Sequence, residues 1–217
     1  CERLSTFGCE KHRRTLRSRL RRGRSAKKAA SESLLVSNPT TSFGYAETFR
    51  LLRTRVEYLL NKNGQKTLLI ASVAEGEGKT ITAANLAVML SYAGNKVLLI
   101  DGNCDTNGNP GLSKLFGITP KDEDCLCARL ETGNVSGLPS PEGAKHLRLL
   151  PNNDFSGDAA DIIVSEKMNK LIRAAREQYD FIIIDTPALC RSGLAEYYAE
   201  LSDCAVMVVR QGVASGR

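Results

Sequence analysis

The residues best suited to chemistry form a short glycine-rich segment, residues 72–80, with the sequence Ser-Val-Ala-Glu-Gly-Glu-Gly-Lys-Thr. Gly76 and Gly78 permit tight backbone turns, so that successive N–H groups can point into one concavity and bind an anion. Lys79 can reach the β- and γ-phosphates of a nucleotide, and the Thr80 hydroxyl can bind Mg²⁺. The predicted nucleotide-binding residues are Glu75, Gly76, Glu77, Gly78, Lys79, Thr80 and Ile81.

The sequence around this segment favours a phosphate loop over the alternative, a glycine-rich turn with a chance Lys-Thr pair. Val73 stands at the first position of the usual eight-residue pattern, where glycine is expected. An apolar run nevertheless predicts a strand over 67–72, and helical spacing predicts a helix over 80–93. Strand, loop and helix therefore follow one another in the order that nucleotide binding requires.

Two carboxylates close apolar runs elsewhere in the chain. Asp101 ends Lys-Val-Leu-Leu-Ile-Asp, and Asp185 ends Phe-Ile-Ile-Ile-Asp. In phosphate-loop enzymes a carboxylate in such a place is a water-mediated or outer-sphere partner of Mg²⁺. A single Asp at a strand end is more often a helix or turn cap, but two of them beside a phosphate loop favour the metal role.

The elements that must position these residues are short strands alternating with helices. Apolar runs predict strands over 67–72, 96–101, 147–151, 181–185 and 204–210. Helices are predicted over 80–93, 165–178 and 193–201, and over 45–61 from the spacing of Phe49, Leu52, Val56, Leu59 and Leu60. Residues 105–145, rich in Gly, Pro and Asn, are predicted as loops with short helices. The fold class is α/β, a doubly wound, mainly parallel sheet with helices on both faces and ligands at the carboxyl ends of its strands.

The charge of the chain is unevenly distributed. The formal net charge is +6, yet residues 1–30 carry eleven Lys or Arg against two Glu, a net of +9. The remaining 187 residues have a net charge of −3, which argues against a nucleic-acid-binding domain. We predict a basic tail and linker over 1–42 and a phosphate-loop domain over 43–217, shortened at its C-terminus.

The basic tail is concentrated between Lys11 and Lys28, where ten of eighteen residues are basic and none is acidic. Such a block is typical of a solvated arm or of the cytoplasmic flank of a membrane helix, and a nucleic-acid arm is a third alternative. Cys1 in place of Met leads us to expect a chain that was cut from a longer one or processed. No run approaches the ~18 apolar residues of a membrane span. The seven cysteines are interpreted as reduced thiols, since their spacing suits no zinc ribbon.

The sequence resembles the bacterial tyrosine kinases of capsular and exopolysaccharide assembly, which are related to septum-placing and chromosome-partition ATPases. Three motifs carry the resemblance: Gly76-Glu-Gly-Lys-Thr80, Leu98-Leu-Ile-Asp101 and Ile182-Ile-Ile-Asp-Thr-Pro187. A fourth, Glu47-Thr-Phe-Arg50-Leu-Leu-Arg53, matches the Glu-x-x-Arg-x-x-Arg motif by which those kinases self-associate. Glu47, Arg50 and Arg53 share roughly one helix face, and the alternative to pairing between subunits is an intrahelical ion-pair stripe.

The resemblance implies transfer of the γ-phosphoryl group of ATP to tyrosine, with Mg²⁺ as the metal. The implied catalytic residues are Lys79 on the phosphates, Asp101 on the metal or as base toward the tyrosine hydroxyl, and Asp185 in the metal shell. Thr80 would hold the metal with these two carboxylates. The implied partners are tyrosine-bearing proteins, further copies of the chain, and a membrane polysaccharide co-polymerase or the chain's own lost transmembrane part. The implied location is the cytoplasmic side of a bacterial plasma membrane, without nucleic acid.

Three features depart from the family pattern. The second strand is followed by Asp101-Gly-Asn103-Cys-Asp105, where the family has Asp-x-Asp-x-Arg. Asn103 lacks the charge to help a metal, and Asp105 reverses the expected charge. The tyrosine-rich C-terminal tail of the family is absent, and the family would continue with at least another strand and helix. Two alternatives therefore stay open: a catalytically weak nucleotide-binding regulator and a partition- or septum-type positioning ATPase.

Overall fold

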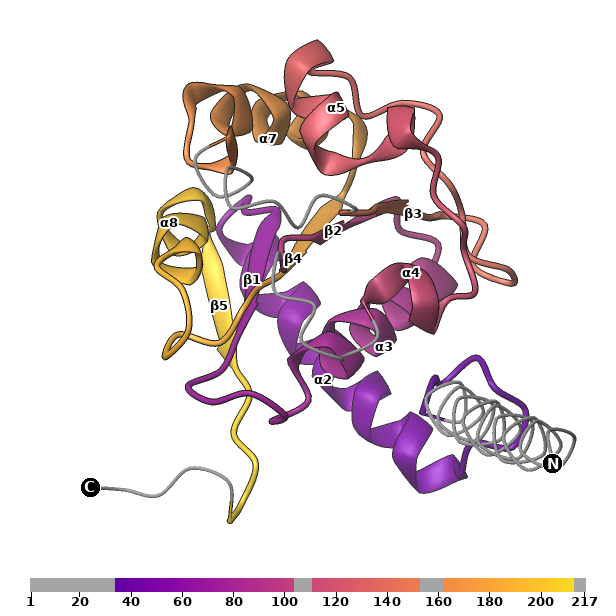
Figure 1. Cartoon of the computed structure of the whole chain (residues 1–217). Helices are drawn as coiled ribbons and strands as arrows, with labels where there is room; N and C mark the ends of the chain where they lie inside the picture. The colour runs from indigo at the N-terminus through magenta and orange to yellow at the C-terminus, as the bar shows by residue number, and fades with distance from the viewer. Residues whose placement is uncertain (1–33, 104–110, 153–161, 213–217) are drawn as a thin grey trace, which may run out of the picture.

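Each apolar run predicted as a strand forms one, and helices connect the strands in turn. The computed structural model describes residues 34–103, 111–152 and 162–212. In chain order (Figure 1) the elements are α2 (Phe43–Lys62), β1 (Thr67–Ala71), α3 (Lys79–Tyr92), β2 (Val97–Asp101), α4 (Leu112–Leu115), η1 (Asp122–Asp124), α5 (Leu126–Thr132), β3 (Leu147–Leu150), α7 (Glu166–Gln178), β4 (Phe181–Asp185), α8 (Leu194–Leu201) and β5 (Cys204–Met207). The basic tail and Asp105 lie outside the described residues.

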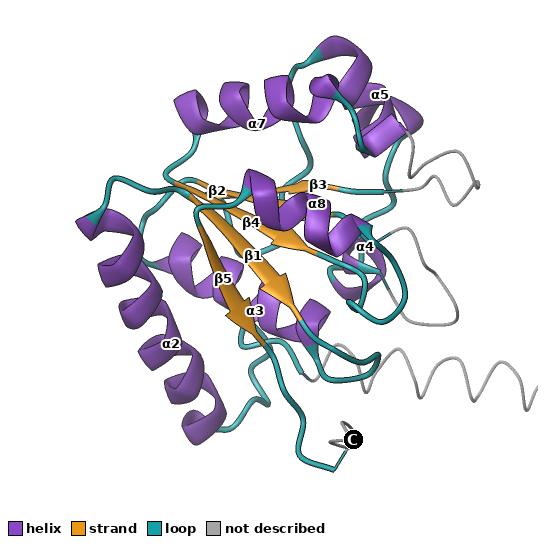
Figure 2. Ribbon diagram, turned by 90° about the vertical axis from the view of Figure 1, so that its left-hand side faces the viewer, coloured by secondary structure: helices purple, strands orange, loops and turns teal. Residues whose placement is uncertain are grey.

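The five strands form one parallel sheet in the order β3-β2-β4-β1-β5. Successive residues of a strand enter different cores: Leu68 and Ile70 pack with α2, α3 and α4, whereas Leu69 packs with α5, α7 and α8. Figure 2 shows α2 and α3 on one side of the sheet and α5 and α7 on the other. The predicted doubly wound α/β fold is confirmed. Because the strands are parallel, their carboxyl ends and the loops that follow them gather along one edge.

Helix α2 begins two residues earlier than predicted because Ser42 caps it, its Oγ accepting from the Tyr45 N–H at 3.3 Å. Phe49, Val56 and Leu60 are buried as their spacing predicts, but Leu59 is 51% exposed because it points away from the sheet. Among the described residues, no helix combines the length and the apolar character needed to cross a membrane.

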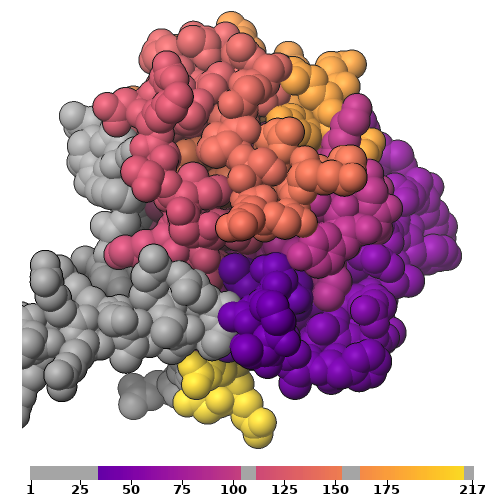
Figure 3. All heavy atoms as spheres, turned by 90° about the vertical axis from the view of Figure 1, so that its right-hand side faces the viewer, coloured from indigo at the N-terminus to yellow at the C-terminus, as the bar shows by residue number. Residues whose placement is uncertain are grey.

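Residues 34–42, predicted as linker, are attached to helix α3 by one buried side chain. The Asn85 side chain, fully buried, accepts from the Val36 N–H at 2.7 Å and donates to the Leu34 carbonyl at 2.9 Å. The Tyr45 hydroxyl donates to the same carbonyl at 3.0 Å. In Figure 3 the indigo residues that begin at Leu34 lie against the rest of the molecule on the face shown. This segment is therefore part of the folded unit.

Strand β5 is shorter than the predicted run over 204–210 and lies at an edge of the sheet, paired with β1 alone. Val208 still donates its N–H to the Ala71 carbonyl at 2.8 Å, after which the chain leaves the sheet. Its next residues reach the glycine-rich loop, where Arg210 forms the contacts described below.

Candidate functional site

The predicted phosphate loop lies between β1 and α3, over residues 72–78. Gly76 and Gly78 have φ values of 74° and 99°, conformations that side-chain-bearing residues rarely adopt. Gly78 precedes α3 without a side-chain cap, and the first bond of the helix joins the Thr82 N–H to the Gly78 carbonyl at 2.9 Å. The N–H groups of the first turn are therefore available to an anion, with the helix dipole favouring negative charge there. The Ile81 side chain packs against the core, which leaves its backbone N–H as its contribution to the site.

Lys79 is held inside this loop. Its side chain is buried (7% exposed), and the Nζ donates to the Ser72 Oγ at 2.8 Å. Ser72 in turn donates to the Ala74 carbonyl at 2.7 Å. A buried ammonium whose hydrogen bond goes to a neutral hydroxyl is a strong anion ligand, since a phosphate would supply a charged acceptor in its place. The sequence did not point to Ser72, because its role arises only when the loop curls back on itself.

The two glutamates of the loop form structural contacts within the protein. Glu77 accepts from the Ala74 N–H at 2.8 Å and from the Arg210 N–H at 3.4 Å, and these backbone bonds lower the pKa of its carboxyl. Glu75 pairs with Arg191 from the loop after β4 at 2.8 Å. Their negative charges are thus compensated beside a site meant for phosphate. Nothing in the sequence pattern marked Arg191 or Arg210 as neighbours of the loop.

The two strand-ending carboxylates lie side by side. Asp101 and Asp185 occupy paired positions on the adjacent strands β2 and β4. Asp101 is 3% exposed, and its two oxygens accept from the N–H groups of Asn103 at 3.3 Å and Leu112 at 3.2 Å. Burial raises the pKa of Asp101 to about 7. Asp101 therefore acts as a turn cap, which was the alternative to a metal role in the sequence analysis. It nevertheless lies beside Asp185 at the candidate site.

Asp185 differs from Asp101 in how its carboxylate is satisfied. It is 1% exposed, and neither carboxylate oxygen has a hydrogen-bond partner among the described residues. Burial, together with the charge of Asp101, raises its pKa to about 7, against the opposing influence of the nearby Thr80 hydroxyl and Lys79 ammonium. A buried carboxylate beside a threonine hydroxyl is the oxygen donor set that Mg²⁺ prefers when phosphates complete its shell. The residues present therefore fit the metal that the sequence predicted.

A glycine permits the close packing behind these carboxylates. A Cβ on Gly102 would lie 2.8 Å from the Asp185 carbonyl oxygen and 2.8 Å from a ring carbon of Tyr198. We expect Gly102→Ala to lower the free energy of unfolding by about 2 kcal/mol or more, since backbone and a fully buried ring must move apart. Gly193→Ala is the control, because a Cβ there meets nothing within 4 Å. Urea denaturation measures both, and equal effects of the two variants would contradict the prediction.

Comparisons with known proteins identify the relatives of this chain. Residues 58–210 match the AAA domain family. The tyrosine-protein kinase YwqD of Bacillus subtilis is 29% identical over 167 residues, which cover 77% of this chain and 69% of that protein. The tyrosine-protein kinase CpsD of Streptococcus agalactiae is 30% identical over 166 residues, 76% of this chain and 70% of CpsD. The succinoglycan biosynthesis transport protein ExoP of Rhizobium meliloti is 32% identical over 184 residues, but the chain spans only 22% of its length.

Solved structures show the same fold. The kinase domain of the Escherichia coli tyrosine kinase ETK superposes with a TM-score of 0.71 at 21% identity, over 83% of this chain and 68% of that one. The septum site-determining protein MinD of Pyrococcus horikoshii, solved with Mg-ADP, has a TM-score of 0.54 at 26% identity, over 66% and 57% of the two chains. The domain match spans most of the chain, and CpsD is covered over more than two thirds of its length. The chain belongs to the AAA domain family and, within it, to the bacterial tyrosine-protein kinases.

Proposed function

We propose that the protein is an ATP- and Mg²⁺-dependent protein tyrosine kinase, capable of autophosphorylation, that regulates capsular or exopolysaccharide synthesis and export. The observation that carries the proposal is the buried, unpartnered Asp185 carboxylate beside the phosphate loop, with the Lys79 ammonium and the Thr80 hydroxyl close by. A structural Asp would have its oxygens satisfied, as those of Asp101 are. The relatives named as tyrosine-protein kinases support the choice of reaction.

Each residue has a distinct part in this reaction. The N–H groups at the start of α3 and the Lys79 ammonium bind the phosphates of ATP and neutralise the charge that develops on them. Thr80 and Asp185 would hold Mg²⁺, which would neutralise charge on the phosphates. The bond between the γ-phosphorus and the oxygen of ADP breaks as the tyrosine oxygen bonds to phosphorus. Asp101, with a pKa raised to about 7, can accept the phenolic proton.

The test is incubation of the chain with Mg-ATP and a synthetic tyrosine-rich peptide, followed by mass spectrometry of both. The proposal predicts phosphotyrosine on the peptide or the chain. ATP binding without transfer would instead favour the catalytically weak regulator, for which Asn103 is the motivating residue, and Asn103→Asp should then restore transfer. Mg-ATP hydrolysis that is stimulated by DNA or membranes, without formation of phosphotyrosine, would favour the positioning ATPase. The fold of this chain is similar to that of MinD, a septum site-determining protein.

We also propose self-association through helix α2. Glu47 pairs with Arg50 along the helix, and the Arg53 Nε lies 3.5 Å from Glu57, so the motif charges form an intrahelical stripe in the single chain. The same helix exposes apolar side chains, Leu51 at 56% and Tyr58 at 66%. Such exposed apolar groups beside a charged stripe are typical of an interface.

Removing the motif should therefore dissociate the assembly. We expect the triple alanine variant of Glu47, Arg50 and Arg53 to sediment as a monomer at concentrations where the unmodified chain is oligomeric. The triple alanine variant of Glu131, Lys167 and Arg173, which removes the same charges from another face, is the control. A monomeric unmodified chain, or equal behaviour of the two variants, would contradict the proposal.

The location proposed for the chain is the cytoplasmic side of the plasma membrane, beside a polysaccharide co-polymerase. The basic segment between Lys11 and Lys28 supports this, since each such residue near an anionic leaflet contributes about 1 kcal/mol. ExoP is a transport protein more than four times as long as the segment that this chain matches. This supports a membrane partner, either joined to the kinase domain in one polypeptide or present as a separate protein.

A further inference from the structure

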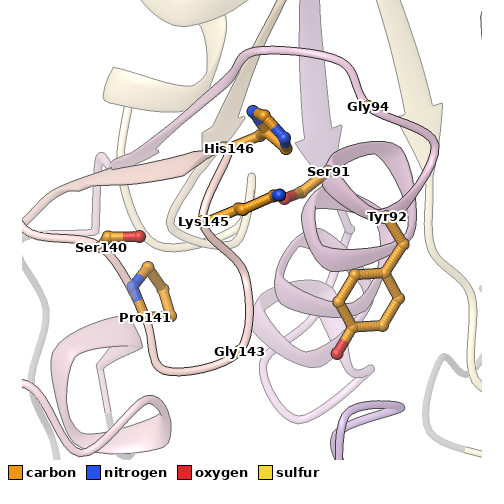
Figure 4. Close-up of a pocket in the computed structure, with 8 residues that line it drawn as sticks. All are labelled: Ser91, Tyr92, Gly94, Ser140, Pro141, Gly143, Lys145 and His146. Carbon is orange, nitrogen blue, oxygen red and sulfur yellow. The ribbon is translucent and has the colours of Figure 1, made fainter.

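A pocket lies at the end of helix α3 that is farther from the phosphate loop. The loop adjoins the first residue of this helix, whereas the pocket is lined by its last turn and by the segment that leads into β3. The cavity has a volume of about 700 Å³, and Figure 4 shows its lining. The lining residues are Ser91, Tyr92, Gly94, Ser140, Pro141, Gly143, Lys145 and His146. No motif of the sequence analysis falls on it.

The lining has a positive character. Lys145 and His146 contribute an ammonium group and an imidazole ring, and the lining includes no acidic residue. Over the described part of the chain, the Lys145 ammonium forms no ion pair with an acidic residue. The imidazole offers an N–H donor in either protonation state. An anion would thus find donors that the protein itself does not use.

A buried hydroxyl strengthens this assignment. Ser91 is 3% exposed, and its Oγ has no hydrogen-bond partner among the described residues. A buried hydroxyl without a partner is costly, and a ligand oxygen in the pocket would satisfy it. Ser91, Lys145 and His146 come from two segments more than fifty residues apart, brought together by the packing of α3 against the β3 edge of the sheet.

The carbonyls at the end of α3 would oppose an anion if they were free, but they are occupied. The Met89 and Leu90 carbonyls accept from the Ala93 N–H at 3.2 Å, and the Ser91 carbonyl accepts from the Gly94 N–H at 3.0 Å. The Leu90 carbonyl also accepts from the Asn95 side chain at 3.2 Å. The negative end of the helix is therefore partly compensated where the pocket adjoins it.

The opposite wall is held in place by its own hydrogen bonds. The Ser140 hydroxyl donates to the Ala144 carbonyl at 3.1 Å, and the Ala144 N–H donates to the Pro141 carbonyl at 3.2 Å. The His146 carbonyl accepts from the Val97 N–H at 3.0 Å, which fixes the histidine beside β2. A pocket formed before the ligand arrives does not have to lose loop entropy on binding.

We propose that this pocket binds phosphotyrosine in a protein segment. Lys145, His146 and the Ser91 hydroxyl would bind the phosphate, and the Tyr92 ring, 50% exposed at the edge of the pocket, would contact the aromatic ring. Recognition of a phosphorylated residue by clustered cations is a common binding mode. The proposed kinase activity would supply phosphotyrosine, so the source of the ligand rests on that function, although binding itself does not.

The test is fluorescence anisotropy with a labelled peptide containing one phosphotyrosine between Gly and Ser residues, in the absence of ATP. The matched tyrosine and phosphoserine peptides separate the contributions of phosphate and ring. We expect the phosphotyrosine peptide to bind at least about tenfold more tightly than either, and Lys145→Gln and Ser91→Ala each to weaken it by about tenfold. Lys121→Gln, which removes the same charge from an exposed side chain outside the pocket lining, should change nothing.

The phosphate loop is a competing anion site, and Lys79→Ala separates the two. Retained peptide binding in Lys79→Ala supports the pocket, while binding lost in Lys79→Ala but kept in Lys145→Gln would overturn the inference. Absence of binding, or equal affinity for the phosphoserine peptide, would also overturn it. A chain that fails to phosphorylate tyrosine yet binds the phosphotyrosine peptide would refute the proposed kinase function and leave the pocket assignment standing.

Discussion

Replacing Lys79 with alanine is expected to lower the rate of phosphoryl transfer by at least about a hundredfold. The ammonium group is the only side-chain cation that the described structure buries in the phosphate loop, and it has one neutral partner, the Ser72 hydroxyl. Removing a preorganised charge from the phosphates raises the barrier because no water can replace it at the same geometry. Phosphotyrosine formation on a synthetic tyrosine-rich peptide measures the effect.

The fold should survive this change. Ser72 keeps its bond to the Ala74 carbonyl, and Glu77 keeps its bond to the Ala74 N–H. We therefore expect the free energy of unfolding to change by less than about 1 kcal/mol. Lys121→Ala, at a side chain 75% exposed, is the matched control and should transfer phosphate at the unmodified rate. Full activity in Lys79→Ala would show that the phosphate loop takes no part in the reaction.

Asp185→Asn is expected to abolish Mg²⁺-dependent transfer and at the same time to stabilise the chain free of ligands. The carboxylate is buried without a hydrogen-bond partner in the described structure, so its charge costs free energy unless a metal is bound. Asparagine keeps the shape and removes the charge. We expect a loss of at least about a hundredfold in transfer, and a gain on the order of 1–2 kcal/mol in the free energy of unfolding at pH 8.

The pH dependence follows from the raised pKa values of Asp101 and Asp185, both about 7 in the folded chain against an ordinary value of 3.8 for this carboxyl group. Between about pH 4 and 7 the folded chain holds more protons than the unfolded chain. The free energy of unfolding of the ligand-free protein should therefore fall as pH rises through this range.

Asp185→Asn should make this decline shallower, and Mg-ATP should stabilise the unmodified chain but not the variant. Urea denaturation at a series of pH values measures both effects. Asp122→Asn, in the exposed turn η1, is the control and should leave the pH profile unchanged. An unaltered profile in Asp185→Asn would show that this carboxylate is not the uncompensated charge.

The strands and the helices between them could be predicted because each carries its own local pattern. Continuous apolar runs, which predict strands buried on both faces of a sheet, indicated all five strands. The glycine-rich segment was interpreted as a phosphate loop because it lies between a predicted strand and a predicted helix. Asp101 and Asp185 could be assigned to one edge because parallel strands end together. Helical spacing alone did not decide which side chains of α2 are buried. Leu59 fits the spacing but is 51% exposed to solvent.

Contacts between distant segments could not be predicted. Arg191 falls in a predicted loop and Arg210 at the end of a predicted strand, and their proximity to Glu75 and Glu77 depends on strand order. The same holds for Asn85, whose amide fixes residues 34–36, and for Ser91 with Lys145. The difference between the two carboxylates also depended on structure, because the Leu112 N–H that satisfies Asp101 comes from eleven residues further along the chain.

The strand order β3-β2-β4-β1-β5 has a consequence for how the chain is made. β1 and β2 are successive in sequence, yet β4 lies between them and pairs with both. In a chain emerging from the ribosome the first two strands therefore cannot become neighbours, and the edges that they share with β4 stay unpaired until Asp185 has been synthesised. The glycine-rich loop is complete about a hundred residues earlier. Such long-range parallel pairing folds slowly, so we expect the proposed use of ATP to begin only after the fourth strand has been inserted.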